Sequence, residues 1–235
     1  LRIDRRAARE RAGGSHEPVL LVAWLLDRVE ARRAAHQIAR TELRERIRGR
    51  PEGEALTDFR IAYPLAYRDL VERHAGEHGV PADLMQALMR EESSLDPQIV
   101  SWAGAVGLTQ LMPGTARAMA RRLKIAPPSD GDLRDPDLNV RLGAAYLGEL
   151  LRRWNGNPAL AAASYNAGPG AVSRWLRERG SLEMDEFVEE IPIEETRNYV
   201  KRVLDSFTTY RLAWGEGEER FVAFEPVRAD GRALR

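Results

Sequence analysis

Hydrophobic positions recur with a helical period over most of this chain. Segments with apolar residues three and four positions apart alternate with short stretches rich in glycine, proline and aspartate, whereas alternation with a period of two is almost absent. We therefore expect an all-α fold, in which residues 221–224 are the one segment with strand-like spacing. The predicted helices cover residues 18–48, 64–79, 81–96, 114–123, 137–154, 160–166, 171–179 and 194–214.

The same pattern divides the chain into four parts. Residues 1–17 are charged and lack apolar periodicity, so they predict a flexible arm, and residues 18–58 predict a helical linker segment. Residues 59–214 carry the dense apolar pattern of a folded domain, and residues 215–235 form a tail rich in glycine and charge. The linker helix is too narrow in apolar content to fold alone, so we expect it to dock on the following domain or on missing upstream sequence.

One predicted helix carries an acidic residue in an apolar face. At 100° per residue, Glu92 falls near the centre of the face that should look into the core. Burial there, close to the negative end of the helix dipole, raises the pKa of a carboxyl group, as a general acid requires. The alternative is a glutamate at a fraying helix end whose side chain reaches solvent. The apolar members of this face are Leu84, Met85, Leu88, Met89 and Leu95.

Composition excludes several other kinds of chemistry. The formal net charge is zero and cysteine is absent, so neither bulk attraction to nucleic acid nor a thiolate nucleophile or ligand is expected. His74 and His78 have the spacing of a zinc pair but no third ligand, which favours structural roles and no metal. No cofactor-binding loop is recognisable. The apolar run 19–26 is too short to span a bilayer, and no signal segment is visible.

Several residues that follow the predicted acid in the sequence have side chains suited to sugar recognition. Hydroxyl, amide, thioether and phenol side chains can bind sugar hydroxyls and N-acetyl groups and offer apolar surface to a ring. The candidates are Ser93, Ser101, Gln110, Met112, Tyr165 and Asn166.

Four motifs in one order resemble a known family. They are Arg90-Glu91-Glu92-Ser93, residues 104–116 (GAVGLTQLMPGTA), residues 163–170 (ASYNAGPG), and residues 189–192 (EEIP) followed by residues 195–200 (ETRNYV). Residues 60–214 thereby resemble the catalytic domain of soluble lytic transglycosylases, the goose-lysozyme-like family twenty-three of glycoside hydrolases. The resemblance implies a lysozyme-like α-helical domain that cleaves peptidoglycan between N-acetylmuramic acid and N-acetylglucosamine, in the bacterial periplasm or cell envelope.

The family's functional residues can be carried over position by position. Glu92 matches the single catalytic acid and base, and Ser101 a serine that positions the muramyl residue. Gln110, Met112, Tyr165 and Asn166 match residues that line the glycan cleft. Glu189 matches a glutamate that contacts sugar from the far side. Residues 59–80 are similar to a linker that joins this domain to a superhelical domain in longer members, so that domain or other cell-wall enzymes are the expected partners beside peptidoglycan.

Two departures and one corollary follow from the resemblance. Family members often carry Met at Thr109, which predicts an altered apolar sugar contact, and Gln at Glu91, where a carboxylate would raise the pKa of Glu92 further. Because substrate groups would supply the nucleophile and the stabiliser, no second carboxylate should be aimed at the cleaved bond; Asp96 and Glu189 are the ones to check. A hydrolase of the same fold and a non-catalytic peptidoglycan-binding module remain the alternatives.

Overall fold

The computed structural model describes residues 17–28, 32–53 and 55–215. In this part the chain forms eleven α-helices and one 3-10 helix, and it contains no β-strand beyond the isolated bridges Val100–Val106 and Val106–Leu111. The all-α prediction is therefore confirmed. The arm before residue 17, the segment 221–224 and the tail beyond residue 215 lie outside the described residues. The helices are α2 (Glu17–Arg28), α3 (Arg32–Glu42), α4 (Ala55–Ala62), α5 (Arg68–His78), α6 (Ala82–Ser93), α7 (Pro113–Arg122), η1 (Asp132–Arg134), α8 (Pro136–Arg153), α9 (Pro158–Ala167), α10 (Pro169–Arg179), α11 (Met184–Glu189) and α12 (Glu194–Trp214).

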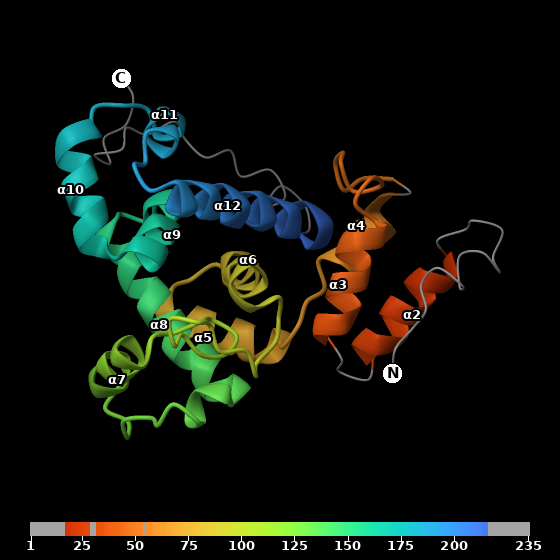
Figure 1. The fold of residues 1–235 in the computed structure, drawn as a ribbon, viewed down its shortest axis with the longest axis horizontal. Coiled ribbons are helices and arrows are strands. Elements are labelled where there is room, and N and C mark those ends of the chain that lie inside the picture. Colours follow the sequence, from red (N-terminus) through yellow and green to blue (C-terminus); the bar gives the residue numbers. More distant parts are fainter. Residues whose placement is uncertain (1–16, 29–31, 54, 216–235) are drawn as a thin grey trace.

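The linker segment forms a helical hairpin and not the single predicted helix. Helices α2 and α3 lie side by side at one end of the molecule (Figure 1), where Val19, Ala23 and Ile38 form a small buried cluster. An apolar stripe too narrow to fold alone is buried when its two halves pack against each other, which explains why the prediction of one helix over 18–48 was wrong. Arg33, in the first turn of α3, is exposed and pairs with Asp96 over 2.9 Å.

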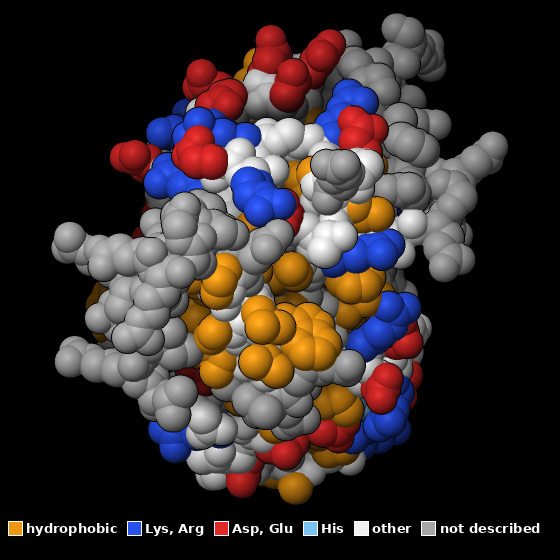
Figure 2. Space-filling view, turned by 90° about the vertical axis from the view of Figure 1, so that its right-hand side faces the viewer, with side chains coloured by type: hydrophobic (Ala, Val, Ile, Leu, Met, Phe, Trp, Pro, Cys, Tyr) orange, Lys and Arg blue, Asp and Glu red, His pale blue; other side chains and the backbone are white. Residues whose placement is uncertain are grey.

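The outer face of α2 stays apolar and accessible. Leu21, Trp24 and Leu25 are each about half exposed, and hydrophobic side chains gather on the face of the molecule that carries this helix (Figure 2). None of the described helices combines the length and the apolar content needed to cross a bilayer.

The predicted helix over 64–79 begins later than expected, and a separate helix precedes it. Helix α4 ends at Ala62, two residues before Pro64, and α5 begins only at Arg68, after Tyr67 in a left-handed conformation (φ 53°). Proline has no N–H for the helical ladder and disfavours helical geometry in the preceding residue, so the break lies where the proline requires it. The predicted end is confirmed, because Gly79 closes α5 with a φ of 67° and donates to carbonyls of the last turn.

Helix α6 is the centre of the fold. It is seen end-on in Figure 1, between α5 and the long helix α12, and every residue from Leu84 to Arg90 is buried. Because neighbours cover it on all sides, even Arg90, which points away from the predicted apolar face, has 5% of its surface exposed. The N-cap of this helix is Pro81, and Asp83 lies within the first turn, where a negative charge is favourable.

The remaining helices follow the sequence pattern closely. Helix α12 covers the predicted residues 194–214, and the observed α7, α8, α9 and α10 each begin or end within two residues of the prediction. Side-chain caps explain two of the starts: Asp135 accepts from Leu138 N before α8, and Asn157 accepts from the N–H groups of Ala159 and Leu160 before α9. The short helix α11 was not predicted.

Candidate active site

Glu92 lies in the last turn of α6, against the first turns of α12. The hydroxyl of Tyr199 in α12 donates a hydrogen bond of 2.5 Å to Glu92 Oε1. Glu92 is partly exposed as a residue, but protein surrounds most of its carboxyl group, and this burial raises the pKa of Glu92 to about 7, with the neighbouring Glu91 adding to the rise. Tyr199 and Arg202 act in the opposite direction because they favour the ionised form. Near neutral pH the side chain can therefore both donate and accept a proton.

A second tyrosine completes the surroundings of this carboxyl. Tyr165 in α9 donates from its hydroxyl to the Thr109 carbonyl over 2.8 Å, and its ring lies 5.1 Å from that of Tyr146. Burial raises the pKa of Tyr165 and of Tyr199 well above the ordinary value, and the negative charge of Glu92 raises both further. Both phenols therefore stay protonated and can act only as hydrogen-bond donors or neutral acceptors beside Glu92.

The Tyr199→Phe variant should raise the pKa of Glu92 above about 7. A hydrogen bond to a charged group contributes about 1.5–3 kcal/mol, which corresponds to a rise of about one to two pH units. A carbon-13 NMR titration of the Glu92 carboxyl group measures this shift without any substrate.

Tyr210→Phe is the matched control for this titration. Tyr210 lies in the same helix, but its hydroxyl donates to the Pro64 carbonyl, so its loss should leave the Glu92 midpoint unchanged. Equal midpoints in wild type and Tyr199→Phe would show that the hydrogen bond does not tune the acid.

The buried amide side chain of Asn139 holds the loop between α6 and α7 in place. Asn139 in α8 accepts from the backbone N–H and the hydroxyl of Thr109 over 2.8 and 2.7 Å, and donates to the carbonyls of Val106 and Leu133 over 3.0 and 2.8 Å. At Gly107, with a φ of 81°, a Cβ atom would come within 2.4 Å of the same amide. The loop therefore rests directly on α8, and only glycine fits at this point.

Within this loop Gln110 and Ser101 are both partly accessible. Gln110 has a φ of 46°, and its amide donates to the carbonyls of Gly107 and Ile99 over 2.9 and 3.2 Å. The hydroxyl of Ser101 accepts from Ala105 N over 3.0 Å. Gln110 keeps its amide oxygen and Ser101 its hydroxyl proton for further bonds, so both positions suit contacts with a ligand.

Ser93 has a structural role and does not face a binding surface. It is 2% exposed, and its hydroxyl is within donor distance of two carbonyls, Met89 at 3.0 Å and Leu108 at 2.8 Å. Ser93 therefore fastens the end of α6 to the loop. The prediction that it contacts substrate does not fit this environment.

The other predicted contact residues lie at separate points of the surface. Met112 is 46% exposed at the start of α7. Asn166 is exposed and accepts from the Thr196 hydroxyl over 2.6 Å, one helical turn before Tyr199. Glu189 forms an exposed ion pair of 2.6 Å with Lys201. The structure thus brings Asn166 close to the helix that holds the acid, while Glu189 is engaged by a lysine.

The acid beside Glu92 faces another way. Glu91 Oε1 accepts from Arg90 Nη1 over 2.5 Å and from the Ser206 hydroxyl over 2.8 Å, and Arg202 lies 3.4 Å from Oε2. These partners compensate its charge, so it adds to the raised pKa of Glu92 less than burial does.

His74 has the structural role expected of it. Its Nε2 lies 2.9 Å from Asp137 Oδ1, and its Nδ1 lies 3.4 Å from Glu77 Oε2. Both ring nitrogens are thus used in hydrogen bonds: Nε2 ties α5 to Asp137 in α8, and Nδ1 bonds to Glu77 within α5.

Comparison with known proteins assigns this arrangement to a family. The model of the family described as "Transglycosylase SLT domain" matches residues 69–188, about half of the chain. The chain belongs to the SLT domain family. The suspected relationship to soluble lytic transglycosylases is thereby confirmed.

Relatives and solved structures of this family resemble the chain over most of its length. The soluble lytic murein transglycosylase of Escherichia coli strain K12 is 40% identical over 66% of this chain and 24% of that protein. The crystal structure of the 70 kDa soluble lytic transglycosylase SLT70 from Escherichia coli matches with a TM-score of 0.77 and 32% identity, over 88% of this chain and 32% of that one. An inactive glutamate-to-glutamine mutant of lytic transglycosylase Slt from Pseudomonas aeruginosa matches with a TM-score of 0.71 and 34% identity, over 84% of this chain and 30% of that one. The chain thus spans about a quarter of the curated relative's length.

Two features of this SLT domain were not apparent from its motifs. The family match ends at residue 188, so Tyr199, the direct partner of Glu92, lies beyond it. Tyr199 lies within the motif at 195–200, but helical spacing alone gives a tyrosine on the apolar side of α12 no role beyond packing. Thr109 is 0% exposed, and its hydroxyl bonds to Asn139. A threonine at this position therefore does not change an apolar sugar contact as expected, because its side chain does not reach the surface.

Proposed function

We propose that this chain is the catalytic part of a peptidoglycan lytic transglycosylase in the bacterial cell envelope. Three findings support the proposal: membership of the SLT domain family, similarity to proteins named murein transglycosylases, and one carboxyl group, Glu92, whose pKa of about 7 suits proton transfer in both directions. The last of these carries the proposal, because it gives the chemistry a specific atom.

The proposed reaction uses Glu92 twice. Protonated Glu92 donates to the glycosidic oxygen between N-acetylmuramic acid and N-acetylglucosamine, and the bond from that oxygen to C1 breaks. The 2-acetamido carbonyl of the muramyl ring stabilises the positive charge at C1. Ionised Glu92 then takes the proton of the C6 hydroxyl on the same ring, whose oxygen bonds to C1. The product is a 1,6-anhydromuramyl end, and the enzyme regains its proton without consuming water.

The carboxyl groups around Glu92 support a mechanism with one acid. Hydrolases with two carboxylates need the second about 5–9.5 Å from the first and aimed at the same bond. Asp96 is paired with Arg33 and caps its own turn by accepting from Gln98 N, and Glu189 is paired with Lys201. Glu91 is the acidic side chain that acts on the pKa of Glu92, and its carboxylate bonds to Arg90 and Ser206 instead.

Substrate contacts are proposed for the polar groups that remain accessible. Ser101 and Gln110 would bind the muramyl residue and the glycan from the loop, Met112 would offer apolar surface, and Tyr165 and Asn166 would bind from α9. Glu189 would contact sugar after releasing Lys201. We omit Ser93 from this set because its hydroxyl is used inside the protein. We also propose that any further partners act through sequence outside residues 59–214, as a superhelical domain would.

Digestion of purified peptidoglycan tests the proposal directly. The expected muropeptides end in 1,6-anhydromuramic acid, because the C6 hydroxyl and not water attacks C1. Mass spectrometry measures this, since the anhydro product is lighter than the hydrolytic product by one water. Reducing muramyl ends would identify a hydrolase of the same fold, and peptidoglycan binding without any release of muropeptides would identify a binding module.

A further inference from the structure

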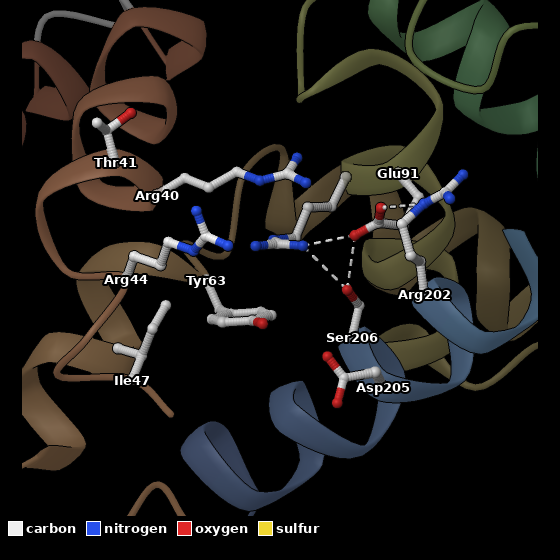
Figure 3. A pocket seen from close by; sticks show the side chains of 10 residues that line it. Arg40, Thr41, Arg44, Ile47, Tyr63, Glu91, Arg202, Asp205 and Ser206 are labelled. Carbon is white, nitrogen blue, oxygen red and sulfur yellow. Dashed lines mark hydrogen bonds and ion pairs between the residues drawn. The ribbon is translucent and has the colours of Figure 1, made fainter. Parts of the chain in front are cut away.

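A cavity of about 630 Å³ lies where the linker hairpin meets the domain. Four arginines line it: Arg40 from α3, Arg44 from the turn that follows α3, Arg90 from α6 and Arg202 from α12. Figure 3 shows the side chains of Arg40 and Arg44 directed into the cavity from the side opposite Glu91 and Arg202. Glu92 is not among the lining residues, so this cavity is separate from the candidate active site.

The positive charge in the cavity exceeds the negative charge. Glu91 is shared between Arg90 and Arg202, whereas Arg40 and Arg44 form no ion pair with any acidic residue that the structure describes. Asp205 is the second acid in the lining, and its half-buried position raises its pKa. Four cations thus face two carboxylates, and like charges that converge in this way are unfavourable without a bound anion.

One buried donor in the cavity wall is unsatisfied. Arg90 is 5% exposed, its guanidinium stacks on the Tyr63 ring at 4.0 Å, and its Nη1 bonds to Glu91 and Ser206. Its Nε has no hydrogen-bond acceptor within the described residues. A buried guanidinium donor without an acceptor is costly, so a ligand that accepts hydrogen bonds here is favoured.

The buried side chain of His36 in α3 lies in the positive electrostatic field of the same arginines. It is 0% exposed, and burial lowers its pKa to about 3, with the charges of Arg90 and Arg40 adding to the effect. His36 is therefore neutral near pH 7 and adds no charge, while Arg90 and Arg40 from two different helices act on one point.

We propose that this cavity binds a phosphate group. A tetrahedral dianion compensates the two excess charges and accepts several hydrogen bonds from guanidinium groups, which bind phosphate in two-pronged geometry. A single carboxylate compensates only one of the two excess positive charges. Because Arg40 and Arg44 belong to the linker hairpin and Arg90 and Arg202 to the domain, the bound phosphate joins the two.

Isothermal titration calorimetry with inorganic phosphate tests the site on the whole chain. At constant ionic strength phosphate should bind at one site and acetate should not. The double variant Arg40→Gln/Arg44→Gln should weaken phosphate binding by at least about tenfold, because each guanidinium contributes a charge-assisted hydrogen bond. Arg121→Gln/Arg174→Gln removes the same charge from two exposed positions and should bind phosphate as the wild type does.

Thermal unfolding distinguishes loss of the site from loss of the fold. Without phosphate Arg40→Gln/Arg44→Gln should melt at or above the wild-type temperature, because two converging charges are removed, and Arg121→Gln/Arg174→Gln should melt with the wild type. With phosphate only Arg40→Gln/Arg44→Gln should fail to gain stability. Glycerol phosphate separates the two sources of the ligand: binding indicates a phosphate monoester, and no binding indicates the free ion. Equal heats for phosphate and acetate, or undiminished phosphate binding by Arg40→Gln/Arg44→Gln, would overturn the proposal.

Discussion

Glu92→Gln is expected to lower the release of muropeptides from peptidoglycan by at least about a thousandfold, since general acid–base catalysis typically contributes 10²–10⁴ and this residue serves both steps. Glutamine keeps the size of the side chain and can still accept the hydrogen bond of Tyr199, which lies 2.5 Å from the carboxyl. Only the transferable proton is lost. Quantitative chromatography of soluble muropeptides measures the effect, and residual release within tenfold of wild type would rule out Glu92 as the acid.

The pH dependence of the melting temperature tests whether Glu92→Gln remains folded. The pKa of Glu92 is raised from 4.5 to about 7 in the folded protein. Below pH 4.5 the carboxyl is protonated in both states and contributes nothing. As the pH rises toward 7 only the unfolded chain ionises, so the folded wild type loses stability, and above 7 the loss stays constant at roughly 3 kcal/mol. Glu92→Gln should therefore melt above wild type at pH 8 and together with it at pH 4.

Asn139→Ala should destabilise the fold by at least about 3 kcal/mol, because each buried group left without its partner costs about 1–3 kcal/mol. The substitution removes the partners of Thr109 N, of the Thr109 hydroxyl and of the carbonyls of Val106 and Leu133. For a domain of this size the melting temperature should fall by roughly 6–12 °C, which calorimetry measures.

Asn157→Ala is the matched control for this substitution. Asn157 caps α9 with two hydrogen bonds to the first turn of that helix and none to the loop, and loss of such a cap costs about 1 kcal/mol. A melting temperature of Asn139→Ala equal to that of Asn157→Ala would mean that the loop does not depend on the amide.

Helix positions could be predicted where local signals and burial agree. The apolar side of α12 continues over its whole length, and Asn157 and Pro158 mark the start of α9. The hairpin of α2 and α3 could not be predicted in this way, because a periodic stripe is compatible with one long helix or with two that fold back. Only the tertiary contact of Val19 and Ala23 with Ile38 decides between them.

The candidate site could be predicted in part for a similar reason. A carboxyl in an apolar face indicates burial, and the raised pKa of Glu92 follows from that one local pattern. Its partner Tyr199 lies 107 residues later in the chain, in a helix where a tyrosine on the apolar side predicts only packing. The prediction that Ser93 contacts substrate does not fit the structure, because no local pattern indicates that its hydroxyl donates a hydrogen bond to the Leu108 carbonyl.

The position of α12 at the end of the described chain bears on biosynthesis. A chain is made from its N-terminus, and its early segments can begin to fold while later ones are still being synthesised. Until α12 emerges from the ribosome, Glu92 lacks Tyr199, and one side of α6 stays open to water. A nascent chain therefore acquires the hydrogen bond that tunes Glu92 only after residues 194–214 have been synthesised.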